Sequence, residues 1–282
     1  MKVPEAKLIC PVCQSQSQPW VRMNNAALNK CEECSHYFTD VTSVSTEETY
    51  GSDYYLNTHR NWFNNPNYKL FSLLGGLIKQ KKAKSILDVG CGDGALLTYF
   101  REVLDEVELH GIDLSSAVVH DAGFTFWQGD FLTCDIKKNF DVVISLAVIE
   151  HISDVNAYVH RIHNLLNSNG FACLMTVNSS GMLYKLAYVL RLLGFHSVFN
   201  RLYDPHHLNH FTQKSLYRLL TKDGLFRVEN IINHNAPLAA IDIPAKNSLI
   251  GLVMRFGIGA VFFIGKITRK TYLQTFVVSR VS

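Results

Sequence analysis

The sequence is poor in charge, and neither sign dominates. Only 18% of its 282 residues are charged, and 27 lysines and arginines stand against 24 aspartates and glutamates. This balance argues against a histone-like or ribosomal role, which needs a strongly basic chain. Because 48% of the residues are hydrophobic, the chain can build a real core, with a length that suits about two domains. A small disulfide-stapled fold and a disordered chain are therefore excluded.

The amino terminus lacks the long apolar run of a secretory signal. Only Leu8 and Ile9 stand between Lys7 and Cys10, whereas a signal peptide needs an apolar segment of roughly 7–15 residues. The seven cysteines are an odd number, which does not suit a secreted disulfide framework. We therefore expect a cytoplasmic protein with reduced thiols.

The near-neutral total hides an uneven distribution of charge. Residues 1–181 carry 14 basic and 20 acidic residues, whereas residues 182–282 carry 13 basic and 4 acidic residues. A segment with a net charge of +9 should face something anionic.

Four of the cysteines form two C-x-x-C pairs. Cys10 and Cys13 are followed, after seventeen residues, by Cys31 and Cys34, and four thiolates so spaced can surround one Zn²⁺ tetrahedrally. No ligand position stays open, so this zinc would be structural. Residues 1–45 hold four basic and four acidic residues, which is a poor match for a phosphate backbone. We predict a zinc ribbon over residues 1–45 that docks on the rest of the chain.

From Ser85 onward, short apolar runs alternate with helical periods. This alternation predicts a parallel sheet covered by helices on both faces, with ligands bound at the carboxyl ends of the strands. Residues 46–84 resemble a helical connector, and residues 85–282 an α/β domain with helical insertions near 180–211 and 236–270. The expected strands are 85–90, 107–112, 124–127, 140–146 and 171–177, and the expected helices lie near 94–104, 115–122 and 154–167.

A glycine-rich turn follows the first of these strands. Asp88 precedes Gly90 and Gly92 in a G-x-G-x-G pattern, which differs from the G-x-G-x-x-G of dinucleotide-binding folds. Asp113 ends the second strand, and Asp130 follows the third. A carboxylate can accept two ribose hydroxyl groups, and an acid beside an apolar pair suits adenine.

Taken together, these segments resemble class I S-adenosylmethionine-dependent methyltransferases over roughly residues 45–282. The resemblance implies a Rossmann-like sheet of seven mostly parallel strands, with residues 271–281 as an antiparallel last strand. It also implies that Asp88, Gly90 and Gly92 hold the methionine part of S-adenosylmethionine. The other implied cofactor contacts are Asp113 to the ribose, Asp130 to the adenine amino group, Leu114 and Phe131 beside the ring, and Leu146 near the sulfonium.

The four cysteines and the Tyr54-Tyr55 pair add a second resemblance. Together they are similar to a methyltransferase subgroup that acts on small metabolites, sugars and lipid-linked intermediates. By that resemblance, the connector over residues 46–84 lies over the cofactor site, and Tyr54 or Tyr55 closes over the cofactor. Packing within the connector is the alternative role for these aromatic side chains.

Histidines supply the candidate catalytic groups. His151 follows the fourth strand and is a candidate general base, because imidazole titrates near neutral pH; ordering of the loop is the alternative. Quinone O-methyltransferases have a similar V-x-E-H segment with a further acid for a divalent metal, but Ala147 stands at that position here. The family resemblance implies that the His-rich segment before Phe211-Thr212 faces the acceptor site through His207 or His210, with loop histidines as the alternative. A metal held by His206 and His210 is disfavoured by the cap expected at Thr212.

Two apolar segments lie in the basic third of the chain. Met182–Gly194 has helical spacing that places Tyr184 and Tyr188 opposite Leu183 and Leu186. Ser248–Gly265 is long enough to span a bilayer, but one crossing would separate neighbouring strands of the sheet. It is therefore either a lid or core helix, or an in-plane contact with anionic lipid. The lipid contact would use Lys246, Arg255, Lys266, Arg269 and Lys270 with Leu249, Leu252, Phe256 and Phe263.

The sequence thus predicts a cytoplasmic methyltransferase, with a possible peripheral contact with the inner membrane surface. Its acceptor would be a hydroxyl of a small-molecule, sugar or lipid-linked intermediate, with nitrogen or carbon as less favoured atoms. The alternatives are an RNA methyltransferase, against which the neutral ribbon argues, and a non-catalytic cofactor-binding subunit. The oligomeric state stays open.

Overall fold

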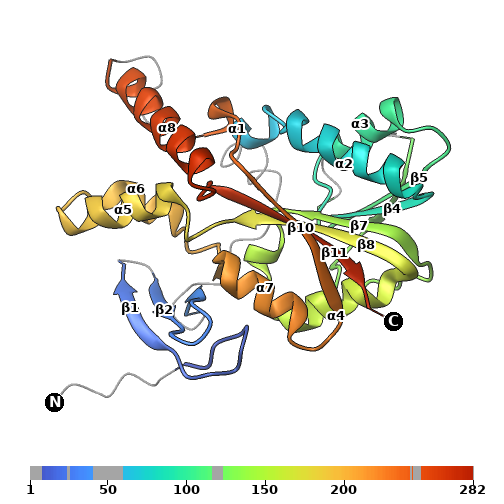
Figure 1. Ribbon diagram of the computed structural model, residues 1–282, viewed down its shortest axis with the longest axis horizontal. Coiled ribbons are helices and arrows are strands. Elements are labelled where there is room, and N and C mark those ends of the chain that lie inside the picture. The colour runs from blue at the N-terminus through green and yellow to red at the C-terminus, as the bar shows by residue number, and fades with distance from the viewer. Residues whose placement is uncertain are drawn as a thin grey trace.

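The computed structural model describes residues 8–23, 26–40, 60–115, 123–241, 243 and 249–281. A central seven-stranded sheet carries helices on both faces, and a smaller sheet packs below it (Figure 1). The strands of the central sheet are β4 (Ser85–Val89), β5 (Glu108–Asp113), β6 (Thr125–Gln128), β7 (Phe140–Leu146), β8 (Leu166–Val177), β10 (Phe226–His234) and β11 (Leu273–Arg280).

The order of the strands confirms the predicted fold class. They run β10-β11-β8-β7-β4-β5-β6, with parallel pairing from β8 through β6. Strand β11 is antiparallel to both of its neighbours, as expected for the last strand. Strand β8 begins at Leu166, earlier than the predicted 171, because its first residues extend past the apolar run.

Helices cover both faces because each has an apolar stripe. On one face, α4 (Val155–Leu165) buries Tyr158, Val159 and Ile162, and on the other α3 (Ala95–Val103) buries Leu97 and Phe100, at the spacing of an amphipathic helix. The other helices are α1 (Arg60–Phe63), α2 (Tyr68–Lys81), α5 (Met182–Leu192), α6 (His196–Leu202), α7 (Gln213–Thr221) and α8 (Leu249–Ile267), with 3₁₀ turns η3 (Ile149–His151) and η4 (Leu238–Ala240).

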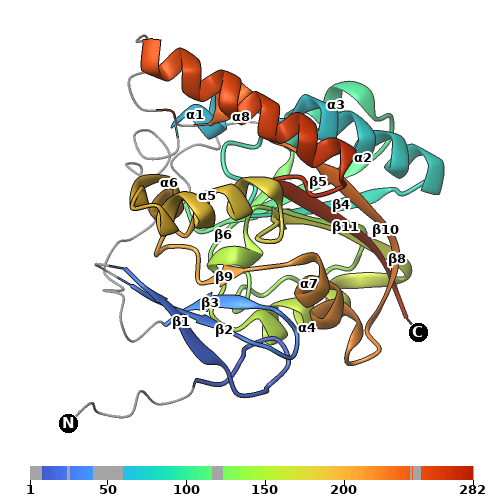
Figure 2. The same ribbon diagram turned by 60° about the vertical axis from the view of Figure 1, so that its left-hand side comes forward.

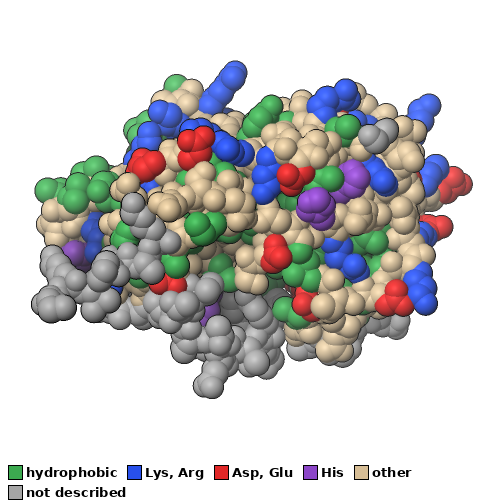
Figure 3. Space-filling model, turned by 90° about the horizontal axis from the view of Figure 1, so that it is seen from below, with side chains coloured by type: hydrophobic (Ala, Val, Ile, Leu, Met, Phe, Trp, Pro, Cys, Tyr) green, Lys and Arg blue, Asp and Glu red, His purple; other side chains and the backbone are tan. Residues whose placement is uncertain are grey.

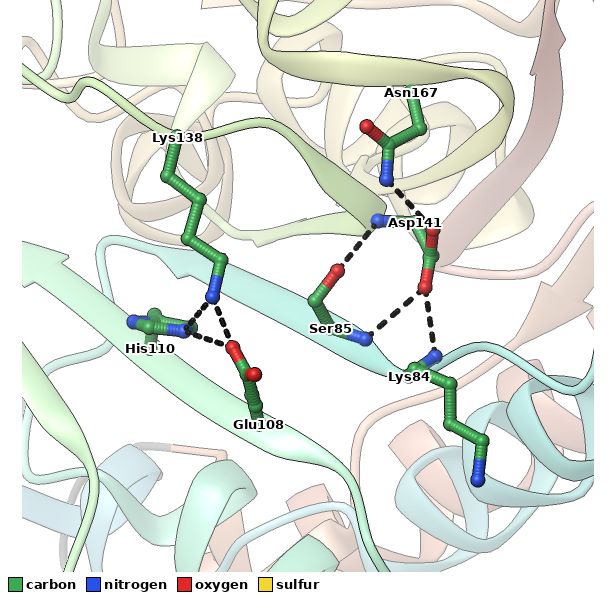
Figure 4. A network of polar contacts seen from close by, with 7 residues as sticks. All are labelled: Lys84, Ser85, Glu108, His110, Lys138, Asp141 and Asn167. Carbon is green, nitrogen blue, oxygen red and sulfur yellow. Dashed lines mark hydrogen bonds and ion pairs between the residues drawn. The ribbon is translucent and has the colours of Figure 1, made fainter.

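A polar network joins the amino-terminal ends of three strands of the central sheet (Figure 4). The Asp141 carboxylate accepts from the backbone N–H groups of Lys84 (2.8 Å) and Ser85 (3.2 Å) and from Asn167 Nδ2 (2.7 Å). These contacts join the starts of β4, β7 and β8. Because this edge is closed by its own side chains, the opposite edge, where the parallel strands end, is the one available to a ligand.

The small sheet joins two distant parts of the chain. It contains β1 (Gln18–Arg22), β2 (Ala27–Lys30) and β3 (Tyr37–Thr39). Strand β3 pairs with β9 (Asn209–His210), which belongs to the segment 204–211 that we call the histidine loop. Val12 and Phe38 of the ribbon belong to the same buried core as α4 and α7. The ribbon therefore packs into the main body, and Figure 2 shows it beside α4 and α7.

Two further expectations concern a predicted helix and the length of the apolar segments. The predicted helix at 115–122 lies outside the described residues, apart from Ser115. Among the helices of the described segments, none meets the length and hydropathy needed to cross a bilayer.

Candidate active site and cysteine cluster

The two C-x-x-C pairs adopt the same local turn. After the first pair, Gln14 N donates to Cys10 O (3.0 Å), and after the second, Ser35 N donates to Cys31 O (2.8 Å). Both Gln14 and Ser35 have positive φ values, 61° and 60°. The repeated turn brings each pair of thiols toward the other pair.

The four sulfur atoms are spaced for one tetrahedral metal ion. Cys10 Sγ lies 3.6 Å from Cys34 Sγ, and Cys13 Sγ lies 3.4 Å from Cys31 Sγ. All four lie within 4.8 Å of one another. A tetrahedron with Zn–S bonds of about 2.3 Å has sulfur–sulfur edges of about 3.8 Å. The cluster therefore fits a structural Zn²⁺, which these four thiolates would enclose.

Helices of the main body hold both cysteine turns. Asn156 Nδ2 on α4 donates to Pro11 O (2.8 Å) in the first turn. In the second turn, Glu33 accepts from Lys214 Nζ at its backbone oxygen (2.7 Å) and from Arg218 Nη1 at its carboxylate (3.0 Å). The surface of the ribbon that faces α4 and α7 is therefore already occupied.

The glycine turn after β4 is fixed by Asp113. Gly90 and Gly92 have φ values of 71° and 53°, a region that favours glycine. A β-carbon at residue 90 would lie 2.4 Å from Val148 Cγ2. Asp113 Oδ2 accepts from Gly92 N (2.9 Å), and Asp113 Oδ1 accepts from Ser115 N (2.9 Å). The acid at the end of β5 thus holds the turn in its ligand-accepting shape.

A cavity opens beside this turn, at the carboxyl ends of the strands. Four predicted residues line it: Asp88, Gly90, Gly92 and Leu146. The rest of the wall comes from the connector, the glycine turn, the start of α3, β8 and the segment before η4, and none of these residues was named individually in the sequence analysis. These residues are Trp62, Phe63, Asn65, Pro66, Asn67, Leu70, Phe71, Cys91, Asp93, Ala95, Leu96, Met175 and Pro237.

The cavity wall is acidic. Burial raises the pKa of Asp88 well above its usual range, and the nearby carboxylates of Asp113 and Asp93 raise it further. No lysine or arginine stands among the described residues that line the cavity. A ligand carrying positive charge would relieve this repulsion. The amino and sulfonium groups of S-adenosylmethionine provide such charge, so the residues present fit this cofactor.

The other described residues that were predicted to contact the cofactor do not line the cavity. Leu114 is half exposed at 51%. Asp130 is exposed, and its Oδ1 accepts from Leu132 N (2.9 Å). Phe131 is buried, with its ring 5.2 Å from that of Tyr158. Tyr54 and Tyr55 lie outside the described residues.

A polar cluster follows directly after β7. Glu150 is buried and accepts from Thr176 Oγ1 (2.8 Å), and burial raises the pKa of Glu150 to about 7. His151 Nδ1 donates to the carbonyl of His206 (3.0 Å). The His207 ring lies 4.8 Å from the His151 ring. Glu150, His151 and His207 each place a ligand atom within 4.8 Å of the others, so they could hold a metal ion or share a proton.

The structure separates the two candidate histidines of the loop. His207 is only partly buried and faces His151, whereas His210 is fully buried. His210 Nε2 lies 3.4 Å from Thr39 Oγ1, which itself donates to His207 O (2.8 Å). Burial lowers the pKa of His210 well below its usual range, so this ring is neutral and lies between the ribbon and the loop.

Comparison with known proteins agrees with this architecture. A family model described as "Methyltransferase domain" matches residues 57–229. A putative methyltransferase of Invertebrate iridescent virus 6 is 24% identical over 60% of this chain and 66% of its own length. A ubiquinone biosynthesis O-methyltransferase of Rhodopseudomonas palustris is 31% identical over 45% of this chain and 52% of its own length. The chain thus spans less than two thirds of either relative.

Solved structures show the same fold. A SAM-dependent methyltransferase from Archaeoglobus fulgidus superposes with a TM-score of 0.50 at 17% identity, over 81% of this chain and 100% of that one. The strand order, the glycine turn and the matching family model lead to one conclusion: the chain belongs to the class I S-adenosylmethionine-dependent methyltransferase family.

Proposed function

We propose that the protein transfers a methyl group from S-adenosylmethionine to a hydroxyl group of a small-molecule, sugar or lipid-linked acceptor. The observation that carries this proposal is the position of the acidic cavity next to the Glu150–His151–His207 cluster. Leu146 lines the cavity, and η3, which contains Glu150 and His151, begins three residues later. The proposed methyl-donor site and the proposed proton acceptor would therefore both lie at the end of β7.

The chain would hold the cofactor chiefly through its acids and glycines. Asp88 and the Gly90–Gly92 turn would bind the methionine part, and Asp113 would bind the ribose. Leu114 and Phe131 with Asp130 remain the proposed adenine contacts, and Tyr54 or Tyr55 the proposed cover. When bound, the cofactor supplies an electrophilic methyl group on a sulfonium. Alignment of the acceptor with that group and exclusion of water by Trp62 and Phe63 would supply most of the rate.

His151 is the residue we assign to remove the acceptor proton. Because Nδ1 carries the hydrogen donated to His206 O, the neutral ring has its lone pair on Nε2. That nitrogen can accept a proton from a hydroxyl as the oxygen attacks. His207, with its ring at 4.8 Å, would orient the acceptor or share the proton, and His210 would support the loop from behind.

The names of the relatives support oxygen as the acceptor atom. The Rhodopseudomonas palustris relative is named for ubiquinone biosynthesis, and another, from Calditerrivibrio nitroreducens, is named a malonyl-[acyl-carrier protein] O-methyltransferase. Their names point to different acceptors, so they support transfer to oxygen without favouring one acceptor among those proposed.

The test is methyl transfer from labelled S-adenosylmethionine to a panel of catechols, sugar hydroxyls and polyprenyl-linked intermediates. We expect incorporation into at least one hydroxyl compound, and at least a tenfold lower kcat for His151→Asn, in line with the loss of a general base. The control is His163→Asn, which changes a histidine of α4 outside the cluster. Labelling that is equal in both variants, or found on nitrogen or carbon alone, would overturn the assignment. Assays with and without added divalent ions separate a base from a metal-held acceptor.

A further inference from the structure

Two helices of the basic third expose an unusual amount of apolar surface. On α8, Leu249, Phe256 and Ile267 are 77%, 73% and 68% exposed. Soluble proteins seldom expose contiguous apolar patches of this kind without a partner. We call this the α5–α8 surface; its apolar members are Val189, Leu192, Leu193, Phe195, Leu249, Leu252, Val253, Phe256, Phe263, Ile264 and Ile267.

The two helices are anchored side by side at one end. Met182 N, at the start of α5, donates to Lys270 O just after α8 (2.8 Å). The Tyr272 ring stacks on Phe262 of α8 and on Tyr184 of α5. From this anchor both helices extend past the sheet at the same end of the molecule (Figure 1). Figure 3 shows hydrophobic side chains gathered at the end where α5 and α6 lie.

The charges around this surface have one sign. Residues 182–202 and 249–270 contain no aspartate or glutamate and seven basic residues. The proximity of Lys270 lowers the pKa of Lys185, so two of these cations lie close together. The seven residues are Lys185, Arg191, Arg201, Arg255, Lys266, Arg269 and Lys270.

We propose that the α5–α8 surface binds the protein reversibly to an anionic lipid bilayer. Apolar side chains enter the acyl boundary while lysines and arginines meet acidic headgroups, which is the pattern of an interfacial helix. A second copy of this chain fits less well, because it would bring two sets of positive charge together. The proposal rests on the surface alone and does not depend on methyl transfer.

The position of the surface links it to the cavity. Helix α8 packs against η4, and η4 packs against α1. Pro237, which precedes η4, and Trp62 of α1 both line the cavity. A bilayer bound at α8 would therefore lie beside the cavity wall, and an acceptor held in the membrane could reach the site without crossing bulk water.

The test is cosedimentation of the full-length protein with vesicles of phosphatidylglycerol and phosphatidylcholine, against vesicles of phosphatidylcholine alone. We expect binding to the anionic vesicles only, weakened at high salt because the charges are screened. Phe256→Ser combined with Leu252→Ser should weaken binding at least fivefold. Changing Lys266, Arg269 and Lys270 to glutamate should weaken it at least tenfold, since each basic residue is worth about fivefold near an anionic leaflet.

Matched control variants distinguish binding through the α5–α8 surface from nonspecific binding to vesicles. Changing Lys79, Lys81 and Lys82 to glutamate alters the same charge at exposed positions around the end of α2, and Leu73→Ser removes an exposed leucine of α2. Both should bind like the unchanged protein. The proposal fails if anionic vesicles are not bound at low salt, or if the controls lose binding equally. It also fails if sedimentation shows a dimer that dissociates in Phe256→Ser, because the surface would then bind a second copy of the chain. Methyl-transfer activity is measured separately without vesicles, so a failure of the membrane proposal can be distinguished from a failure of the proposed methyl transfer.

Discussion

At the scale of single residues, the contacts of Asp113 with the glycine turn lead to a test of the cofactor role that we propose for it. Its carboxylate holds the glycine turn through Gly92 N and Ser115 N, and we assign it to the ribose hydroxyls. Asp113→Ala should weaken S-adenosylmethionine binding by about 1.5–3 kcal/mol, the range for hydrogen bonds to a charged group. Isothermal titration calorimetry checks this. The exposed carboxylate of Asp135 provides the control, and equal affinity in wild type and Asp113→Ala would remove the assignment.

Glu150 makes stability depend on pH in an unusual direction. Its folded-state pKa of about 7 lies above the ordinary value of 4.5 because the carboxyl is buried. Between these values the unfolded chain loses the proton while the folded protein keeps it, so stability falls as pH rises from 4.5 to 7. The whole loss amounts to ~3 kcal/mol.

Urea denaturation at pH 5 and pH 8 measures this effect. Glu150→Gln keeps an oxygen for Thr176 and cannot ionise, so its stability relative to wild type should increase from pH 5 to pH 8. Glu102→Gln, at an exposed position on α3, should follow wild type. A constant difference between Glu150→Gln and wild type across this range would show that Glu150 is not held neutral.

At the scale of elements, the ribbon supports the histidine loop. His36 Nε2 lies 3.1 Å from Asn209 Oδ1, and Asn209 Nδ2 donates to Ile152 O (2.7 Å), directly after η3. Strand β9 therefore connects the ribbon to η3, the turn that carries Glu150 and His151. Because the glycine turn is held separately by Asp113, damage to the ribbon should disturb the acceptor side more than the cofactor side.

Loss of zinc tests this connection. The protein should contain one zinc per chain, and Cys31→Ala or chelation should release it, because its binding energy stabilises the ribbon. We expect the KM for the acceptor to rise at least fivefold while the affinity for S-adenosylmethionine changes less than twofold. Cys134→Ala, a half-buried thiol outside the ribbon, is the control. Zinc-free protein with an unchanged KM would contradict the connection.

At the scale of the whole molecule, the ribbon and the main body share one core. Cys10, Val12 and Phe38 pack in the same buried cluster as Tyr158 and Phe211. We therefore expect one cooperative thermal transition. A variant that keeps only Trp20, in the ribbon, and one that keeps only Trp127, in β6, should melt together by fluorescence. A ribbon that melts earlier would show two independent units.

Local sequence determined the elements and much of the cofactor turn. Apolar runs predicted β4 and β7 closely, and the capping residue Thr212 marked the start of α7. Gly90 and Gly92 were identified from their alternate spacing directly after a strand, and their positive φ values in the structure, 71° and 53°, favour glycine. Strands, helix caps and tight turns depend mainly on residues that are close together in the chain, so they can be predicted from the sequence.

The tertiary structure decided which faces are buried and which distant residues meet. On α5, helical spacing separated a tyrosine side from a leucine side but left open which one is buried: Tyr184 is buried and donates to Leu202 O (3.1 Å), whereas Leu186 is 39% exposed. Periodicity groups residues on a helix but does not say which neighbour will cover them. In the same way, the pairing of β3 with β9, the burial of His210 and the approach of His207 to His151 join segments that are far apart in sequence. Such contacts follow from packing of the whole chain, so local sequence patterns could not predict them.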